Sequence, residues 1–126
     1  MPKASKDSAS TVEQMGPMGE NRHEDLGGYQ VDFLSFVQDG DLAPLLVGLP
    51  DDRCQSPHWG YVVKGSLTMH VGDREEVYGA GDAFYIAPGH TPTWVAGTEI
   101  VQFSPTADIE RTVEVIRANM EAMQGG

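Results

Sequence analysis

Short strand-like runs, separated by glycine-containing turns, fill the stretch from His58 to Ser104 and constrain the fold more than any other feature. The runs are rich in β-branched and aromatic residues, and turns such as Gly72-Asp73 divide them at regular intervals. Strands this short and evenly spaced indicate an all-β, antiparallel domain that closes into a barrel or folds into two packed sheets. No second compositional block or internal repeat is visible in the 126 residues, so we expect a single domain.

Two segments of this stretch resemble the paired motifs of the cupin family. The first is Tyr61-Val62-Val63-Lys64-Gly65, and the second runs from Gly81 to Ala87-Pro88-Gly89. The resemblance covers roughly residues 29–104. It implies an antiparallel, cupin-like (jelly-roll) β-barrel over residues 26–105, with a small-molecule ligand bound in its centre.

The metal-ligand positions of the cupin motifs carry altered residues in this chain. His58 falls where the family has a glutamate, and Cys54 and Asp52 fall where it has two histidines. The ligand position of the second motif falls on Pro92, two residues after His90. The resemblance therefore implies a different ligand set from the usual three histidines and one glutamate.

Cys54, His58 and His90 are the candidate metal ligands. A thiolate with two imidazoles suits a single divalent transition metal, either Zn, Fe, Ni or Cu, with Asp52 or water completing the site. The alternative is that both histidines are hydrogen-bonded pocket residues and that Cys54 is a small buried apolar residue.

Four aromatic residues lie beside these positions and are candidates for a substrate pocket: Trp59, Tyr61, Tyr85 and Trp94. Side chains two apart on a strand share a face, so Trp59 and Tyr61 are expected to point the same way. Aromatic residues in strands also form ordinary core. We expect core for most of the four and a pocket position for at least one tryptophan.

The two ends of the chain differ from the middle. Residues 1–25 are polar and rich in Ser, Gly and Pro, which predicts a flexible N-terminal arm. Over residues 106–124 apolar side chains recur at helical spacing, which predicts a C-terminal α-helix packed on the barrel or on a partner subunit. The recurring apolar positions are Ile109, Val113, Ile116, Met120 and Met123. We also expect a homodimer, since exposed edge strands need covering.

Charge and composition exclude several classes of partner. The chain has 19 acidic and 8 basic residues and a formal net charge of −11, which disfavours nucleic acid and membrane partners. The polar beginning of the sequence lacks the apolar region of a signal peptide, and Cys54 is the single cysteine, so we expect a cytoplasmic protein.

Two functions remain open at this stage. The first is a metal-dependent enzyme acting on a small molecule inside the barrel, for which the resemblance implies dioxygenase, isomerase or lyase chemistry. The second is a non-catalytic binder or sensor of a small molecule that has lost the metal site. Cys54, His58 and His90 favour the first function, and the missing cupin ligands favour the second.

Overall fold

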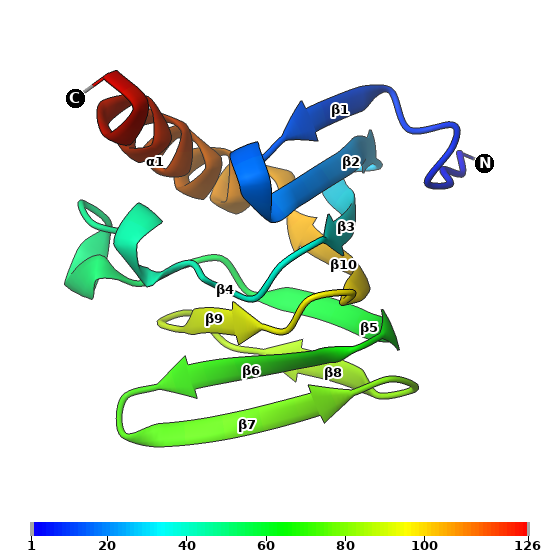
Figure 1. Ribbon diagram of the computed structural model, residues 1–126. Coiled ribbons are helices and arrows are strands. Elements are labelled where there is room, and N and C mark those ends of the chain that lie inside the picture. The colour runs from blue at the N-terminus through cyan, green and yellow to red at the C-terminus, as the bar shows by residue number, and fades with distance from the viewer. Residues whose placement is uncertain (1, 126) are drawn as a thin grey trace.

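The computed structural model describes residues 2–125, which form two β-sheets and one long helix (Figure 1). The elements in chain order are β1 (Thr11–Gln14), η1 (Gly16–Met18), β2 (Gly19–Leu26), β3 (Tyr29–Phe36), β4 (Gly40–Asp41), η2 (Ala43–Leu45), η3 (Pro50–Asp52), β5 (His58–Lys64), β6 (Ser66–Val71), β7 (Arg74–Gly79), β8 (Ala83–Ile86), β9 (Thr91–Trp94), β10 (Glu99–Pro105) and α1 (Thr106–Gly125). Over this range no helix is both long enough and apolar enough to cross a membrane.

The sheets are antiparallel and are built from strands distant in sequence. The larger sheet has the order β1-β2-β3-β10-β5-β8, and the smaller has the order β4-β9-β6-β7. Consecutive strands β5 and β6 lie in different sheets, and so do β9 and β10, so the chain crosses between the two layers repeatedly. This arrangement confirms the predicted all-β, jelly-roll type of fold, with two packed sheets rather than one closed ring of strands.

The main core fills the space between the two sheets. It consists of Phe36, Val62, Leu67, Met69, Phe84, Ile86, Trp94 and Ile100, all of them buried. On β6, Leu67 and Met69 are buried while Thr68 and His70 are partly exposed, as strand alternation requires. The alternating side chains therefore place one apolar face of each sheet against the other.

Gly65 explains why the first motif ends in glycine. Its φ is +80°, in the left-handed region, and an added Cβ would lie 2.6 Å from the Cα of Thr98. No other residue type fits this close approach without moving the backbone. The Gly65 turn carries the chain from β5 in the larger sheet to β6 in the smaller one.

The N-terminal segment differs from the arm predicted from the sequence. Residues 11–26 form β1 and β2, and β2 pairs along its whole length with β3. The short 3-10 helix η1 between the two strands places Met15 and Met18 against the main core. The polar composition misled the prediction because the inward side chains of these strands face other polar groups. His23, for example, lies 2.6 Å from Glu13, which also binds Arg117 on α1.

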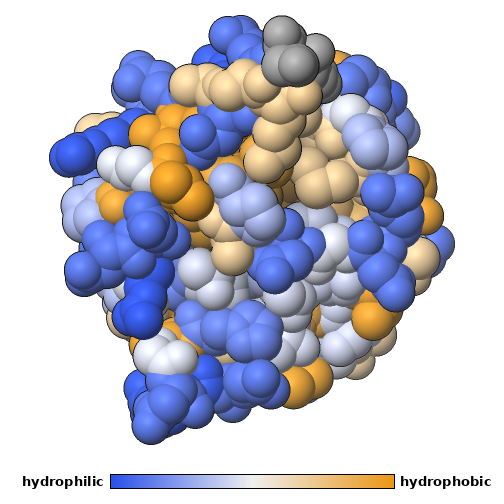
Figure 2. Space-filling view, turned by 60° about the vertical axis from the view of Figure 1, so that its left-hand side comes forward, coloured by the Kyte–Doolittle hydropathy of each residue, from blue (hydrophilic) through white to orange (hydrophobic). Residues whose placement is uncertain are grey.

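Helix α1 is present as predicted and packs on the protein's own sheet and loops. It lies against η2, β10 and β3, at one end of the space between the sheets (Figure 1). Ile109 and Thr112 are buried, whereas Met123, which the apolar stripe predicted to be buried, is 61% exposed. Figure 2 shows this end of the molecule, where hydrophilic side chains cover most of the surface and apolar ones gather in its upper part.

Candidate metal centre and adjoining cavity

Three segments bring Cys54, His58 and His90 together. Cys54 lies in the loop before β5, His58 is the first residue of β5, and His90 directly precedes β9. Cys54 and His90 form an isolated antiparallel bridge, in which the Cys54 amide donates to the His90 carbonyl at 3.0 Å. This backbone pairing fixes the thiol and the second imidazole relative to each other.

The three donor atoms form a compact, buried cluster. They all lie within 4.8 Å of one another, and the residues are 3%, 4% and 1% exposed. Cys54 Sγ is 3.5 Å from His58 Nε2, and the two imidazole rings meet edge to face at 4.8 Å. Ligands of a tetrahedral zinc ion lie about 3.4–3.6 Å apart, given bond lengths of about 2.0–2.3 Å. The cluster, at most 4.8 Å across, fits such an ion after a contraction of about 1.2–1.4 Å at its widest side.

Hydrogen bonds behind the rings orient both imidazoles. His90 Nδ1 lies 2.8 Å from the carbonyl oxygen of Ala87, which accepts only, so Nδ1 carries the proton and Nε2 keeps a free lone pair. His58 Nδ1 lies 2.6 Å from the Oγ of buried Ser104, and its Nε2 faces Cys54. Partners of this kind commonly fix the tautomer of a metal-binding histidine.

Burial keeps all three groups neutral when no cation is bound. It lowers the pKa of His58 to about 3, with a smaller contribution from the neighbouring His90. Burial also lowers the pKa of His90, although the hydrogen bond to Ala87 acts in the opposite direction. Burial raises the pKa of the Cys54 thiol, against hydrogen bonds with Ser56 and Thr112. Neutral imidazoles are the form that binds metals, and the thiol loses its proton on binding.

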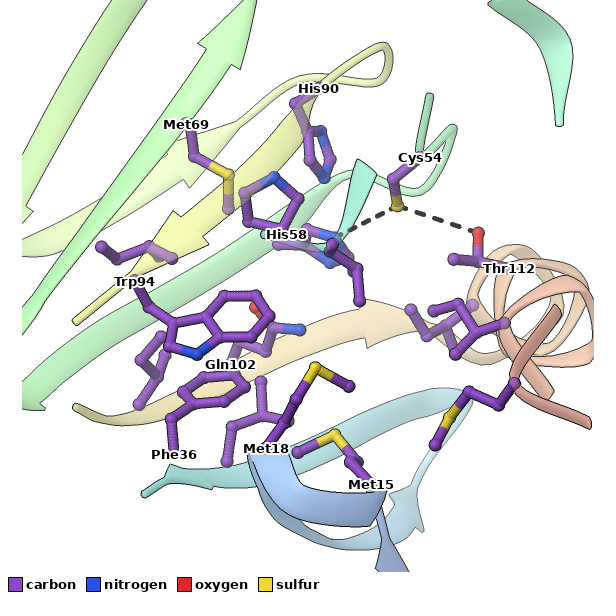
Figure 3. Close-up of a pocket in the computed structure, with 18 residues that line it drawn as sticks. Met15, Met18, Phe36, Cys54, His58, Met69, His90, Trp94, Gln102 and Thr112 are labelled. Atoms are coloured by element: carbon purple, nitrogen blue, oxygen red, sulfur yellow. Dashed lines mark hydrogen bonds between the residues drawn. The ribbon is translucent and has the colours of Figure 1, made fainter. Parts of the chain in front are cut away.

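The cluster forms part of the wall of a cavity of about 120 Å³ between the two sheets and α1 (Figure 3). Figure 3 shows Met15 and Met18 on the side opposite His90, with Trp94 stacked on Phe36. The lining residues are Met15, Met18, Leu34, Phe36, Leu42, Cys54, His58, Leu67, Met69, His90, Pro92, Trp94, Ile100, Gln102, Ile109, Thr112, Ile116 and Met120. The cavity is therefore largely apolar, with the metal-binding types gathered on one wall.

The structure divides the four predicted pocket aromatics. Trp94 is buried, lines the cavity, and lies so close over Gly40 that a Cβ there would meet its ring at 2.3 Å. Trp59, Tyr61 and Tyr85 are 42–52% exposed on the outer face of the larger sheet, so their assignment to the pocket is corrected. The predicted common direction of Trp59 and Tyr61 holds, but it points outward because His58 and Val62 take the inner face of β5.

Asp52, Pro92 and His70 lie near the motifs in sequence but outside the cluster. Asp52 is exposed and accepts a hydrogen bond from the Gly48 amide, so it does not complete the predicted ligand set. Pro92 lines the cavity without offering a donor atom, and His90 supplies the imidazole instead. His70 contacts Thr93 and Glu75 at the rim of the smaller sheet.

The cavity wall also contains Gln102, Thr112, Met15 and Met18, to which the motif spacing does not point. Thr112 follows Ile109 by three residues and precedes Ile116 by four, so it is a polar residue inside the apolar stripe. Its Oγ1 lies 3.8 Å from Cys54 Sγ, within the polar corner of the cavity (Figure 3). A polar residue within the apolar stripe is therefore the sequence feature that could have indicated Thr112 as a cavity residue. No comparable sequence signal marks the two methionines.

Comparisons with known proteins agree with this architecture. A family model described as a cupin domain matches residues 53–102, which contain all three donors. The chain has a fold of the cupin type. A comparison with curated proteins finds no match.

Solved structures similar to this chain share its fold at low sequence identity. An RmlC-like cupin from Shewanella frigidimarina is 17% identical, with a TM-score of 0.56 over 81% of this chain and 88% of its own. KdgF from a Halomonas species is 19% identical, with a TM-score of 0.52 over 75% of this chain and 87% of its own. A protein of unknown function from Rhizobium leguminosarum is 17% identical, with a TM-score of 0.60 over 82% of this chain and 95% of its own. These likenesses establish the fold and leave the activity to be argued from the site.

Proposed function

We propose that this cupin binds one divalent transition metal through Cys54, His58 and His90 and acts on a small molecule held in the adjoining cavity. The observation that carries the proposal is the cluster itself, in which three buried donor atoms lie within 4.8 Å of one another on the cavity wall. Three protein ligands with a remaining position open to a ligand are typical of catalytic rather than structural metal sites. The reaction classes implied by the cupin resemblance are those of a dioxygenase, an isomerase or a lyase.

The protein's own residues have distinct parts in this proposal. The Ala87 carbonyl accepts a hydrogen bond from His90 Nδ1, and Ser104 Oγ pairs with His58 Nδ1, so both imidazoles are held through Nδ1 and leave Nε2 on the opposite side of the ring. The apolar lining excludes bulk water from a substrate, which strengthens any polar interaction inside the cavity. A bound divalent ion would supply Lewis-acid chemistry at that wall.

Metal content and reconstitution test the proposal. The protein is prepared under reducing conditions, exposed in turn to Zn, Fe, Ni and Cu, and analysed for bound metal after gel filtration. We expect about one metal ion per chain in the wild type and none in His58→Ala. Cys54→Ser is expected to bind more weakly and to lose the thiolate absorption that cobalt(II) gives in the wild type.

His70→Ala is the matched control, since His70 lies outside the cluster and is partly exposed. This variant is expected to bind metal as the wild type does. The proposal is contradicted if the wild-type protein binds none of the four metals. It is also contradicted if His70→Ala and His58→Ala weaken metal binding equally.

The alternative function is a non-catalytic binder of small apolar molecules. The observation that favours it is the lining, because among the described residues the cavity wall carries no carboxylate that acts as a general acid or base. Burial of apolar surface alone gives such a ligand affinity. A metal-free protein that still binds a small hydrocarbon, with quenching of Trp94 fluorescence, would support this alternative.

A further inference from the structure

The cavity lining is uncharged apart from the candidate metal centre. Among the residues described, the wall contains no Asp, Glu, Lys or Arg. Besides the three donors, the polar side chains of the wall are Gln102, Thr112 and Trp94, and the Trp94 indole donates outward to the Gln38 carbonyl at 3.1 Å. A ligand inside the cavity therefore meets one polar corner and otherwise apolar surface.

We infer that the metal-loaded cavity takes a small apolar molecule with a single negative charge, bound to the metal through its charged group. This inference rests on the proposed function, because it starts from a divalent ion held by Cys54, His58 and His90. It goes further in naming the class of ligand that the cavity selects.

The charge of the loaded site gives the sign and size of the ligand charge. A divalent cation bound by one thiolate and two neutral imidazoles keeps one net positive charge. A single uncompensated charge in an apolar cavity is costly, and an anion as fourth ligand neutralises it. A neutral ligand leaves the charge in place, and a cationic ligand doubles it. A cupin site in which Cys54 were histidine would instead keep two positive charges.

Asp32 is a buried carboxylate close to the cavity, but it does not serve as the anionic ligand. It lies behind the cavity wall, at the position of β3 that pairs with Gln102 of β10. Its carboxylate accepts from Gln30 Nε2 at 2.7 Å and from Asn21 Nδ2 at 3.2 Å. Asp32 is therefore held by the amide groups of Gln30 and Asn21 and lies outside the cavity lining.

The cavity sets the size of the apolar part. Its volume of about 120 Å³ is close to that of an apolar cavity of about 150 Å³ that holds benzene. Four methionines, Met15, Met18, Met69 and Met120, contribute to the wall. Because their unbranched side chains adapt to different shapes, the site favours compact ligands of roughly six to eight heavy atoms without a strict requirement on branching.

Two isosteric probes test the charge requirement directly. Zinc-loaded protein is titrated with 3-methylbutanoate and with 3-methylbutanamide, which have the same number of heavy atoms and differ by one charge. Calorimetry measures both affinities, and Trp94 fluorescence in a Trp59→Phe background confirms that each ligand enters the cavity. We expect the carboxylate to bind at least about 100-fold more tightly than the amide. In the metal-free protein the amide should bind better than the carboxylate.

The outcomes separate this inference from the proposed function. A protein that takes up no zinc overturns both. A protein that takes up one zinc ion per chain but binds the two probes equally keeps the proposed function and overturns this inference. Preference for the carboxylate in the metal-free protein also overturns it, since the charge would then be recognised by some group other than the metal.

A pair of variants provides an independent check. Thr112 Oγ1 lies beside Cys54 Sγ, so Thr112→Asp brings a carboxylate to the metal centre, and Thr112→Asn is the neutral control of the same shape. Zinc content and thermal midpoint are measured for both. We expect Thr112→Asp to bind 3-methylbutanoate at least about 10-fold more weakly than Thr112→Asn does, because the built-in charge neutralises the metal. Equal affinities in the two zinc-loaded variants refute the inference.

Discussion

Truncation of Ile109 measures how strongly α1 closes the cavity. Ile109 is 6% exposed and reaches from the first part of the helix into the cavity wall. Ile109→Ala removes three buried carbon atoms, which costs about 2.4 kcal/mol at about 0.8 kcal/mol for each. Large-to-small changes of this kind cost about 2–5 kcal/mol, and residues surrounded on all sides give the larger values. Because Ile109 faces the cavity on one side, we expect about 2–3 kcal/mol.

Urea unfolding followed by circular dichroism gives the result. With a dependence on urea of about 2 kcal/mol/M, the midpoint of Ile109→Ala should fall by about 1–1.5 M. Met123→Ala, at a 61% exposed position of the same helix, is the control and should shift the midpoint by less than about 0.3 M. Equal shifts in the two variants would show that the helix does not dock on the cavity as described.

Three further predictions follow from other parts of the structure. Burial raises the pKa of Asp32, so the free energy of unfolding should fall as the pH rises from about 3.9, the unfolded value, through the folded pKa. Asp32→Asn should remove this pH dependence, so that the variant has a higher free energy of unfolding than the wild type in urea near pH 7. A lower free energy of unfolding at that pH would refute the raised pKa of Asp32. Deletion of residues 2–18 should uncover the cavity at Met15 and Met18, lowering the thermal midpoint by several degrees and increasing the binding of a hydrophobic dye, whereas deletion of residues 2–9 should do neither. Finally, we propose that the expected homodimer forms through the exposed aromatic side chains of Trp59, Tyr61 and Tyr85 on the outer face of the larger sheet. Tyr85→Glu should give a monomer in light scattering, and Val77→Glu, on the other sheet, should give a dimer. A monomeric wild type would contradict this proposal.

The sequence predicted the fold well because strand length, turn glycines and motif spacing all depend on local backbone geometry. Spacing from Gly65 in the first cupin-like motif pointed to Cys54 and His58, the second motif pointed to His90, and the structure brings the three residues together. The shift from Pro92 to His90 was also within reach, because residues two apart share a face.

Motif spacing could not predict which face of β5 points inward, nor that residues 11–26 form strands β1 and β2. Alternation groups Trp59 with Tyr61 and His58 with Val62, but both groups are apolar enough to face the core. Phe84 decides between them: its ring fills the space over Gly60, where a Cβ would lie 2.5 Å from it. Strand β2 was not predicted because its side chains are polar and lack an apolar alternation. It pairs with β3 through polar positions, such as His23 opposite the buried Asp32.

The order in which the chain is synthesised separates the donors from the helix that covers them. Cys54, His58 and His90 belong to the middle of the sequence, whereas Met18 and Met120, which face the same cavity, are about a hundred residues apart. During translation the donor residues leave the ribosome before α1 does. The thiol and imidazoles therefore emerge before the helix that encloses them.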